Sequence, residues 1–237
     1  PLPPTPGSIN SRPPDLFRSQ FQQLYGPPTT ARPAPALSPA YSDRTMGYGL
    51  PVSNPLHRAM YGQISDEGHT LPAIPYSRID PRYLRQEMDY RTAEAPGTIV
   101  VDTPAHYLYL VMENNRALRY GVGVGKDEAL LFRGDATIGR KAEWPRWTPT
   151  QSMIRREPDR YGPYAGGMDP GPTNPLGPRA LYLYKNGADT LFRIHGTTEP
   201  YTIGTNVSSG CIRLMNQDII DLYARVPSGT CVTVINA

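Results

Sequence analysis

The chain has 237 residues, which is enough for one or two domains at roughly 150 residues each. Charged residues make up 19% of it and the formal net charge is +3. This net charge is too small to indicate nucleic-acid binding, and the sequence has no block of lysine and arginine that would indicate it. No apolar run approaches about eighteen residues, so we expect no transmembrane segment.

Prolines divide the chain into two parts. Fifteen of the 28 prolines lie within residues 1–75. Such a segment buries too little apolar surface to offset its ordering entropy, so we predict a proline-rich, largely irregular and mostly disordered arm over residues 1–75. Apolar residues at helical spacing suggest one short helix over residues 15–25, either in a solvated linker or docked on the domain or a partner.

The chain begins with Pro1 and shows no apolar signal segment. We therefore expect a processed or truncated chain whose targeting segment is already gone. Residues 76–95 carry Tyr76, Tyr83 and Tyr90 among charged residues, and we expect an ordered lead-in that packs on the domain. Asp80-Pro81 predicts a short helix from Arg82 to Asp89.

Residues 96–237 show a mainly β pattern, with short apolar runs separated by turn signals. Asn114-Asn115 and Asn186-Gly187 predict tight hairpin turns. One late helix is expected, with Asn216 as its N-terminal cap and Asp218 in its first turn. This pattern favours a β-sandwich or barrel with one late helix. Strands are expected at residues 98–101, 106–112, 116–124, 135–138, 180–184, 190–195 and 230–235.

A long irregular stretch, residues 141–179, separates two of these strands and holds several aromatic residues. Loops of this length in a compact domain are usually lids or binding loops. We expect a lid that faces a substrate, the alternative being that its aromatic residues only cover one end of the sandwich.

Cys211 and His195 are the candidate nucleophile and base. His195 ends a predicted strand, and Cys211 follows Gly210 just before the late helix. An imidazole can activate a thiol, Arg213 adds positive potential, and Gly210 lets backbone N–H groups approach an oxyanion. The spacing alone leaves open a core histidine and a small buried cysteine.

The residues around this pair resemble the L,D-transpeptidase (YkuD-type) catalytic domain. That family's motif is His-Gly, then, after about a dozen residues, Ser-His-Gly-Cys with an Asn or Arg after it. The chain matches it at His195-Gly196 and at Ser208, Gly210, Cys211 and Arg213. It departs at Ser209, where many members have His. The resemblance covers about residues 96–237 and implies a β-sandwich catalytic domain there.

The resemblance also implies an acyltransferase that acts on peptidoglycan stem peptides. Cys211 would attack the bond before the terminal D-alanine, and the resulting thioester would pass to an amine. His195 would move the proton, and the Gly196 carbonyl would hold its tautomer. The expected oxyanion donors are the N–H groups of Gly210 and Cys211. Ser208 and Ser209 are expected to shape the site, and Arg213, Trp147, Met168 and Asn174 to bind substrate.

The family further implies no metal or organic cofactor, a periplasmic or cell-envelope location, and inhibition by carbapenems. The acceptor stays open between a second stem (a 3–3 cross-link), an outer-membrane protein, a free D-amino acid and water. Two other functions stay open as well, a cysteine peptidase or amidase of another fold and a non-catalytic wall-binding module. We expect Cys231 to be a buried structural thiol, the alternative being a Cys211–Cys231 disulfide.

Overall fold

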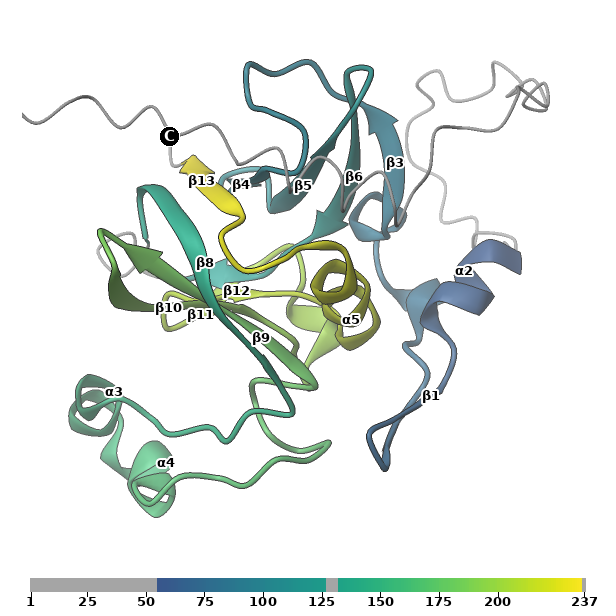
Figure 1. The fold of residues 1–237 in the computed structure, drawn as a ribbon. Helices are drawn as coiled ribbons and strands as arrows, with labels where there is room; N and C mark the ends of the chain where they lie inside the picture. Colours follow the sequence, from purple (N-terminus) through teal and green to yellow (C-terminus); the bar gives the residue numbers. More distant parts are fainter. Residues whose placement is uncertain (1–54, 127–131, 236–237) are drawn as a thin grey trace, which may run out of the picture. The chain divides into compact units, whose positions relative to one another are not determined.

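The computed structural model describes residues 55–126 and 132–235 (Figure 1). The predicted helix over residues 15–25 and most of the predicted arm lie outside these ranges. Among the described residues, no helix combines the length and apolar character needed to cross a membrane.

The described chain is mainly β, as predicted, and nine of its strands form one mixed sheet. Two more pairs form small separate sheets, β1 (Ile64–Asp66) with β2 (His69–Leu71) and β7 (Val124–Gly125) with β11 (Asn206–Ser208). In spatial order the large sheet contains β12 (Ile212–Arg213), β10 (Ala188–His195), β9 (Arg179–Lys185), β8 (Gly134–Glu143), β13 (Cys231–Ile235), β4 (Ile99–Asp102), β5 (Tyr107–Met112), β6 (Arg116–Gly121) and β3 (Gln86–Asp89).

The helices are short. The predicted late helix is confirmed as α5 (Asn216–Arg225), the longest helix of the described chain. The sequence pattern did not predict the others, because each is too short to show a helical apolar stripe. They are α2 (Pro55–Tyr61), α3 (Gln151–Arg156), α4 (Pro158–Tyr161) and the 3-10 turns η1 (Tyr76–Arg78), η2 (Pro81–Tyr83), η4 (Gly162–Tyr164) and η5 (Pro200–Thr202).

β8 joins the two halves of the large sheet. Its first residues pair with β13 and its later ones with β9, the change occurring at Thr137. A register shift follows at Gly139, where a Cβ would lie 2.3 Å from the Tyr184 ring, so only glycine fits. Side chains from both halves and from α5 meet in one core. The two layers expected of a sandwich are therefore halves of one hydrogen-bonded sheet.

Both predicted asparagine turns are present. Asn114 and Asn115 have φ of 59° and 56°, and Asn186-Gly187 has 53° and 78°, values that Asn and Gly tolerate. β8 is longer than the predicted strand over residues 135–138. The reason is that its second half, Gly139 to Glu143, is mostly polar and only partly covered, so it lacks the apolar signal of a strand.

Residues 55–75, which composition placed in the irregular arm, are folded. α2 and the β1–β2 hairpin lie here, and Tyr61 and Leu71 are fully or almost fully buried. Tyr61 joins a second apolar cluster with Ile79, Leu84 and Met215. A few large side chains are enough to dock this segment, although its average composition is poor in apolar residues.

The predicted helix from Arg82 to Asp89 is wrong. Asp80-Pro81 starts only the 3-10 turn η2, whose Arg82 N–H donates to Asp80. The chain then extends as β3, which pairs antiparallel with β6. An isolated helix this short is marginal in water, whereas β3 gains backbone pairing with β6. Tyr90, just after β3, stacks on Tyr109 with ring centroids 4.3 Å apart.

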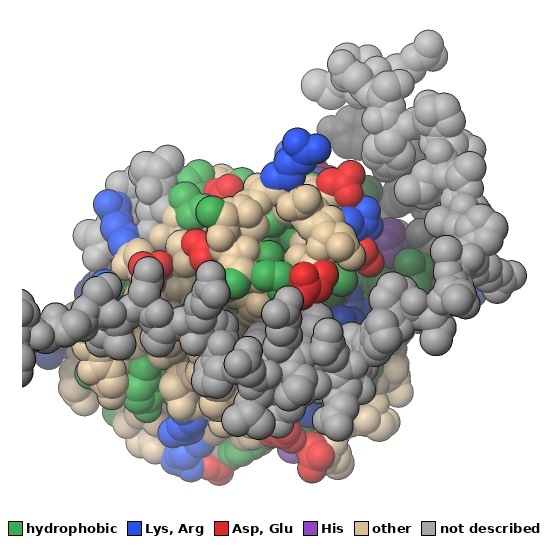
Figure 2. All heavy atoms as spheres, turned by 45° about the horizontal axis from the view of Figure 1, so that its top comes forward, with side chains coloured by type: hydrophobic (Ala, Val, Ile, Leu, Met, Phe, Trp, Pro, Cys, Tyr) green, Lys and Arg blue, Asp and Glu red, His purple; other side chains and the backbone are tan. Residues whose placement is uncertain are grey.

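The surface carries charges of both signs. On the face shown in Figure 2, the visible Lys and Arg side chains are interspersed with Asp and Glu side chains. This distribution agrees with the small net charge and gives no basic stripe on the part of that face that the structure describes.

Candidate active site

Two parallel strands bring His195 and Cys211 together. β10 ends at His195, and β12 begins one residue after Cys211. Their register places His195 opposite Arg213, and the Leu214 N–H donates to the His195 carbonyl at 2.8 Å. Since neighbouring strands lie about 4.8 Å apart, Cys211 comes beside the end of β10. The sequence shows two residues sixteen positions apart, and strand pairing makes them neighbours.

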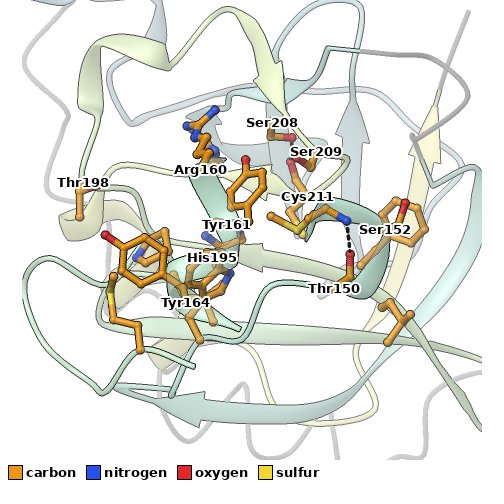
Figure 3. Close-up of a pocket in the computed structure, with 18 of the residues that line it drawn as sticks. Thr150, Ser152, Arg160, Tyr161, Tyr164, His195, Thr198, Ser208, Ser209 and Cys211 are labelled. Atoms are coloured by element: carbon orange, nitrogen blue, oxygen red, sulfur yellow. Dashed lines mark hydrogen bonds between the residues drawn. The ribbon is translucent and has the colours of Figure 1, made fainter. Parts of the chain in front are cut away.

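Both side chains face one pocket of about 510 Å³ (Figure 3). One wall comes from β10 and the segment from Ser208 to Arg213. The other comes from the chain between β8 and β9, residues 144–178, which we call the lid. α3 and α4 belong to the lid and stand away from the sheet in Figure 1.

The ring of His195 is held in one tautomer. His195 is 4% exposed, and its Nδ1 lies 2.6 Å from the carbonyl oxygen of Gly196. A carbonyl only accepts hydrogen bonds, so Nδ1 carries a proton and donates it. In the neutral ring Nε2 is then free to accept one. Burial, with added repulsion from Arg213, lowers the pKa of His195 to about 3, which keeps the ring neutral near pH 7.

The Cys211 thiol is also uncharged at rest. Burial raises its pKa above the ordinary value, while a hydrogen bond from the Arg193 backbone and the charges of Arg193 and Arg213 oppose that shift. A raised thiol pKa and a lowered imidazole pKa both disfavour a thiolate–imidazolium pair. The arrangement fits a thiol that loses its proton as it reacts.

The loop before Cys211 is closed by Ser208. The buried Ser208 hydroxyl accepts from the Gly210 N–H at 3.1 Å and donates to the Cys211 carbonyl at 2.5 Å. Gly210 has φ of 118°, a conformation that favours glycine. In this conformation the Ser208 hydroxyl takes the Gly210 N–H, one of the two expected oxyanion donors, so its role in binding an oxyanion stays a prediction. Within the described residues the Cys211 N–H has no acceptor. Ser209 lines the pocket.

Arg213 is paired within the pocket. Its guanidinium donates to Glu199 at 3.0 Å, and both side chains line the cavity. The Arg213 side chain is 18% exposed and that of Glu199 57% exposed. A substrate carboxylate that approached Arg213 would compete with Glu199.

Trp147 and Met168 lie side by side in the lid and line the pocket. Each N–H donates to the other's carbonyl, at 3.0 and 2.7 Å. Asn174 does not line the pocket, so its expected contact with substrate is wrong. It is fully buried, its amide nitrogen donates to the Pro145 carbonyl at 3.0 Å, and its oxygen accepts from the Leu176 N–H at 2.9 Å. Asn174 holds the lid's own backbone together.

Asn216 does not cap α5, contrary to the prediction. Met215 occupies the cap position, and the Asn216 side-chain oxygen accepts from the Thr197 N–H at 3.0 Å. A Cβ on Gly196 would lie 2.4 Å from that oxygen, and one on Gly177 2.5 Å from it. Asn216 therefore fixes the backbone that follows His195, including the carbonyl that orients the imidazole.

Cys231 is exposed, so the expected buried structural thiol is wrong. Val232 and Val234 point into the core, and the alternation of β13 turns Cys231 outward. Both cysteines are free thiols, and the alternative Cys211–Cys231 disulfide is absent.

Several pocket residues were not among the expected substrate contacts. Tyr161 and Tyr164, from α4 and η4, belong to the aromatic residues of the predicted lid, and both line the pocket (Figure 3). Leu191, 64% exposed, and Glu199 carry no pattern that would have marked them. Among the described residues, no group of three or more His, Cys, Asp or Glu could hold a metal ion.

The chain is similar to several known proteins. A putative L,D-transpeptidase from the ATP synthase subunits region of Fuscovulum blasticum is 39% identical over 167 residues, 69% of this chain and 82% of that protein. The probable L,D-transpeptidase YbiS of Escherichia coli K12 is 35% identical over 173 residues, 72% of this chain and 51% of YbiS. The chain spans about half the length of the E. coli relatives it matches.

A crystal structure of a probable carnitine operon oxidoreductase CaiA from Brucella melitensis is 48% identical, with a TM-score of 0.46, and covers 69% of this chain and 99% of that one. The family model of the L,D-transpeptidase catalytic domain (YkuD) matches residues 96–234, which include His195, Cys211 and the lid. On this match, the chain belongs to the L,D-transpeptidase catalytic-domain family.

Proposed function

We propose that this protein is a cysteine-dependent L,D-transpeptidase that acts on peptidoglycan stem peptides. The observation that carries the proposal is the shared pocket of Cys211 and His195, with the His195 Nδ1–H donated to the Gly196 carbonyl. This hydrogen bond leaves Nε2 as the ring atom that can accept the thiol proton.

In the first half-reaction the Cys211 sulfur attacks the carbonyl carbon before the terminal D-alanine, and its proton passes to His195 Nε2. The tetrahedral oxyanion is stabilised by the Cys211 N–H, the unoccupied donor beside the sulfur. The C–N bond then breaks, the D-alanine nitrogen takes the proton from Nε2, and a thioester remains on Cys211.

In the second half-reaction an acceptor amine attacks the thioester and gives a proton to His195 Nε2. The C–S bond breaks, the new amide forms, and the Cys211 sulfur recovers its proton. Both imidazole steps use one nitrogen, so a ring locked at Nδ1 serves both. Arg213, Trp147 and Met168 are the residues we expect to contact the stem, since all three line the pocket.

The same proposal places the enzyme in the periplasm or cell envelope and makes Cys211 a target of carbapenems. The acceptor is a second stem, an outer-membrane protein, a D-amino acid or water.

The test is incubation with purified muropeptides, followed by mass spectrometry. We expect loss of D-alanine and a new amide with the wild type, and product reduced by at least about a thousandfold with Cys211→Ala. Cys231→Ser is the matched control and keeps full activity, because Cys231 lies in β13 outside the pocket. Product from Cys211→Ala would remove the nucleophile assignment, and no product from the wild type would remove the proposed activity.

A further inference from the structure

The two ends of the lid lie against each other. The Trp144 N–H donates to the Pro178 carbonyl at 2.7 Å, where β8 ends and β9 begins. More than half of the pocket-lining residues belong to the lid. We call Trp144 and Pro178 the lid ends. Their position therefore determines where the lid wall of the pocket lies.

One carboxylate from outside the lid, that of Asp66, binds a side chain at each of the two lid ends. Asp66, at the end of β1, accepts from the Trp144 indole Nε1–H at 2.7 Å. It also accepts from both terminal nitrogens of Arg179, the residue after Pro178, at 2.7 and 2.8 Å. The side chains of Asp66 and Arg179 are only 15% and 8% exposed, so water screens this pair weakly.

The β1–β2 hairpin that carries Asp66 is itself fixed at its other end. The Gln217 amide nitrogen, in the first turn of α5, donates to the carbonyls of Gly62 and Pro72 at 3.0 Å each. At the hairpin's tip, the ring of His69 lies over Trp144 with centroids 4.1 Å apart. The hairpin thus connects the start of α5 with the two lid ends.

We infer that Asp66 is a positioning residue for the substrate pocket. By joining the two lid ends, Asp66 keeps the lid wall of the pocket in place. The inference rests on the proposed function for what the pocket binds. It adds a contribution from residues 55–75, which lie outside the matched catalytic domain at residues 96–234. Asp66 acts through Trp144 and Arg179 and touches neither Cys211 nor His195.

The test compares Asp66→Asn with Asp89→Asn in a Cys231→Ser background, which leaves Cys211 as the only thiol. Asp89 is a matched control because it also pairs with an arginine, Arg116 at 2.9 Å, but lies on the exposed edge strand β3. Glu143, 3.7 Å from Arg179, remains to balance the guanidinium in Asp66→Asn, so this variant is expected to fold.

Three measurements distinguish a displaced lid wall from a change in the catalytic pair, Cys211 and His195. Trypsin cleavage after Arg155 or Arg156, both exposed in α3, should be about tenfold faster in Asp66→Asn because the lid opens more often. KM for the stem peptide should rise about tenfold with kcat changed less than threefold, on the order expected for a lost charge-assisted contact. The slope of the Cys211 alkylation rate against pH, with iodoacetamide as reagent, should stay unchanged, because the thiol and imidazole are untouched and a more open lid changes only the access of the reagent.

Unchanged trypsin cleavage and unchanged KM in Asp66→Asn would overturn the inference. A changed slope of Cys211 alkylation against pH would also overturn it, since the effect would then lie in the catalytic pair. If the wild type forms no transfer product, the proposed function fails, and the trypsin and alkylation results still decide the role of Asp66. Trp144→Phe, which removes the indole donor and part of the ring beside His69 but keeps the Asp66–Arg179 pair, should give a smaller shift in the same direction and serves if Asp66→Asn does not fold.

Discussion

His195 and Cys211 face the same pocket in uncharged forms. Burial is the largest influence on both groups, raising the pKa of the thiol and lowering that of the imidazole to about 3. An ion pair at rest would need the reverse order of these two pKa values. Both side chains are therefore neutral before the reaction, and charge develops only when the substrate carbonyl is attacked.

We predict that Cys211 reacts with iodoacetamide at a rate that rises about tenfold per pH unit between about pH 6 and 9, without a plateau. The reason is that the thiolate fraction grows in this range when the thiol pKa lies above it. The measurement uses Cys231→Ser, because the exposed Cys231 would otherwise contribute. A pH-independent rate from about pH 5 to 8 would instead indicate a thiolate–imidazolium pair and contradict the assignment.

Ser208 and Asn216 show how the catalytic residues are supported. Ser208 closes the loop before Cys211, and Asn216 holds the backbone after His195 through Thr197. Neither side chain supplies a reacting atom. Each restrains the main chain next to one, which is how a site keeps its geometry before substrate arrives.

β10 carries an unusual bend beside the pocket. Its register with β9 shifts between Asp189 and Arg193, and Leu191 within this bulge has φ of 66°. The Asp189 side chain accepts from the Leu191 N–H at 2.8 Å and holds the bend. A leucine in this left-handed conformation is strained by about 1–2 kcal/mol.

Leu191→Gly should therefore raise stability by about 0.5–1 kcal/mol, and the melting temperature by roughly 2 °C. The side chain is 64% exposed, so little packing is lost. Thermal unfolding followed by circular dichroism measures the change. Leu56→Gly in α2, where the backbone is not left-handed, is the control and should lower stability. A lower melting temperature for Leu191→Gly would show that the bend is not strained.

The whole molecule depends on the segment before the catalytic domain. Tyr61 donates to Asp218 at 3.3 Å, and Arg85 lies 2.7 Å from Asp221, so residues 55–95 bring a hydroxyl and a cation to two carboxylates of α5. Burial raises the pKa of Asp218 to about 7, even though Arg85 lowers it. Without Arg85 this buried carboxyl group would lose its opposing charge.

A chain of residues 55–237 should keep the melting temperature of the full protein within a few degrees. The free energy of unfolding of a chain of residues 96–237 should be lower by at least about 3–5 kcal/mol, the usual cost of removing one partner of a buried ion pair. This shorter chain also lacks the residues that cover two apolar clusters. Circular dichroism and soluble yield check both. A stable 96–237 fragment would contradict the view that residues 55–95 belong to the folded unit.

Local patterns were enough to predict the class of the fold. Alternating apolar residues, the asparagine turns and the α5 stripe depend on neighbours in sequence, and the strands and late helix formed where these signals lie. The motif around His195 and Cys211 is local too, so the family and the candidate pair could be identified. Where the pattern weakened, as in the polar half of β8 or in residues 55–75, the prediction failed.

The tertiary structure decided the rest, because those features depend on residues far apart in the chain. Strand pairing sets Cys211 beside His195, burial sets their protonation, and the Ser208 hydroxyl accepts a hydrogen bond from the Gly210 N–H. Asp66 meets Arg179 across 113 positions. A sequence shows which groups are available, whereas packing and burial determine which of them meet and in which charge state.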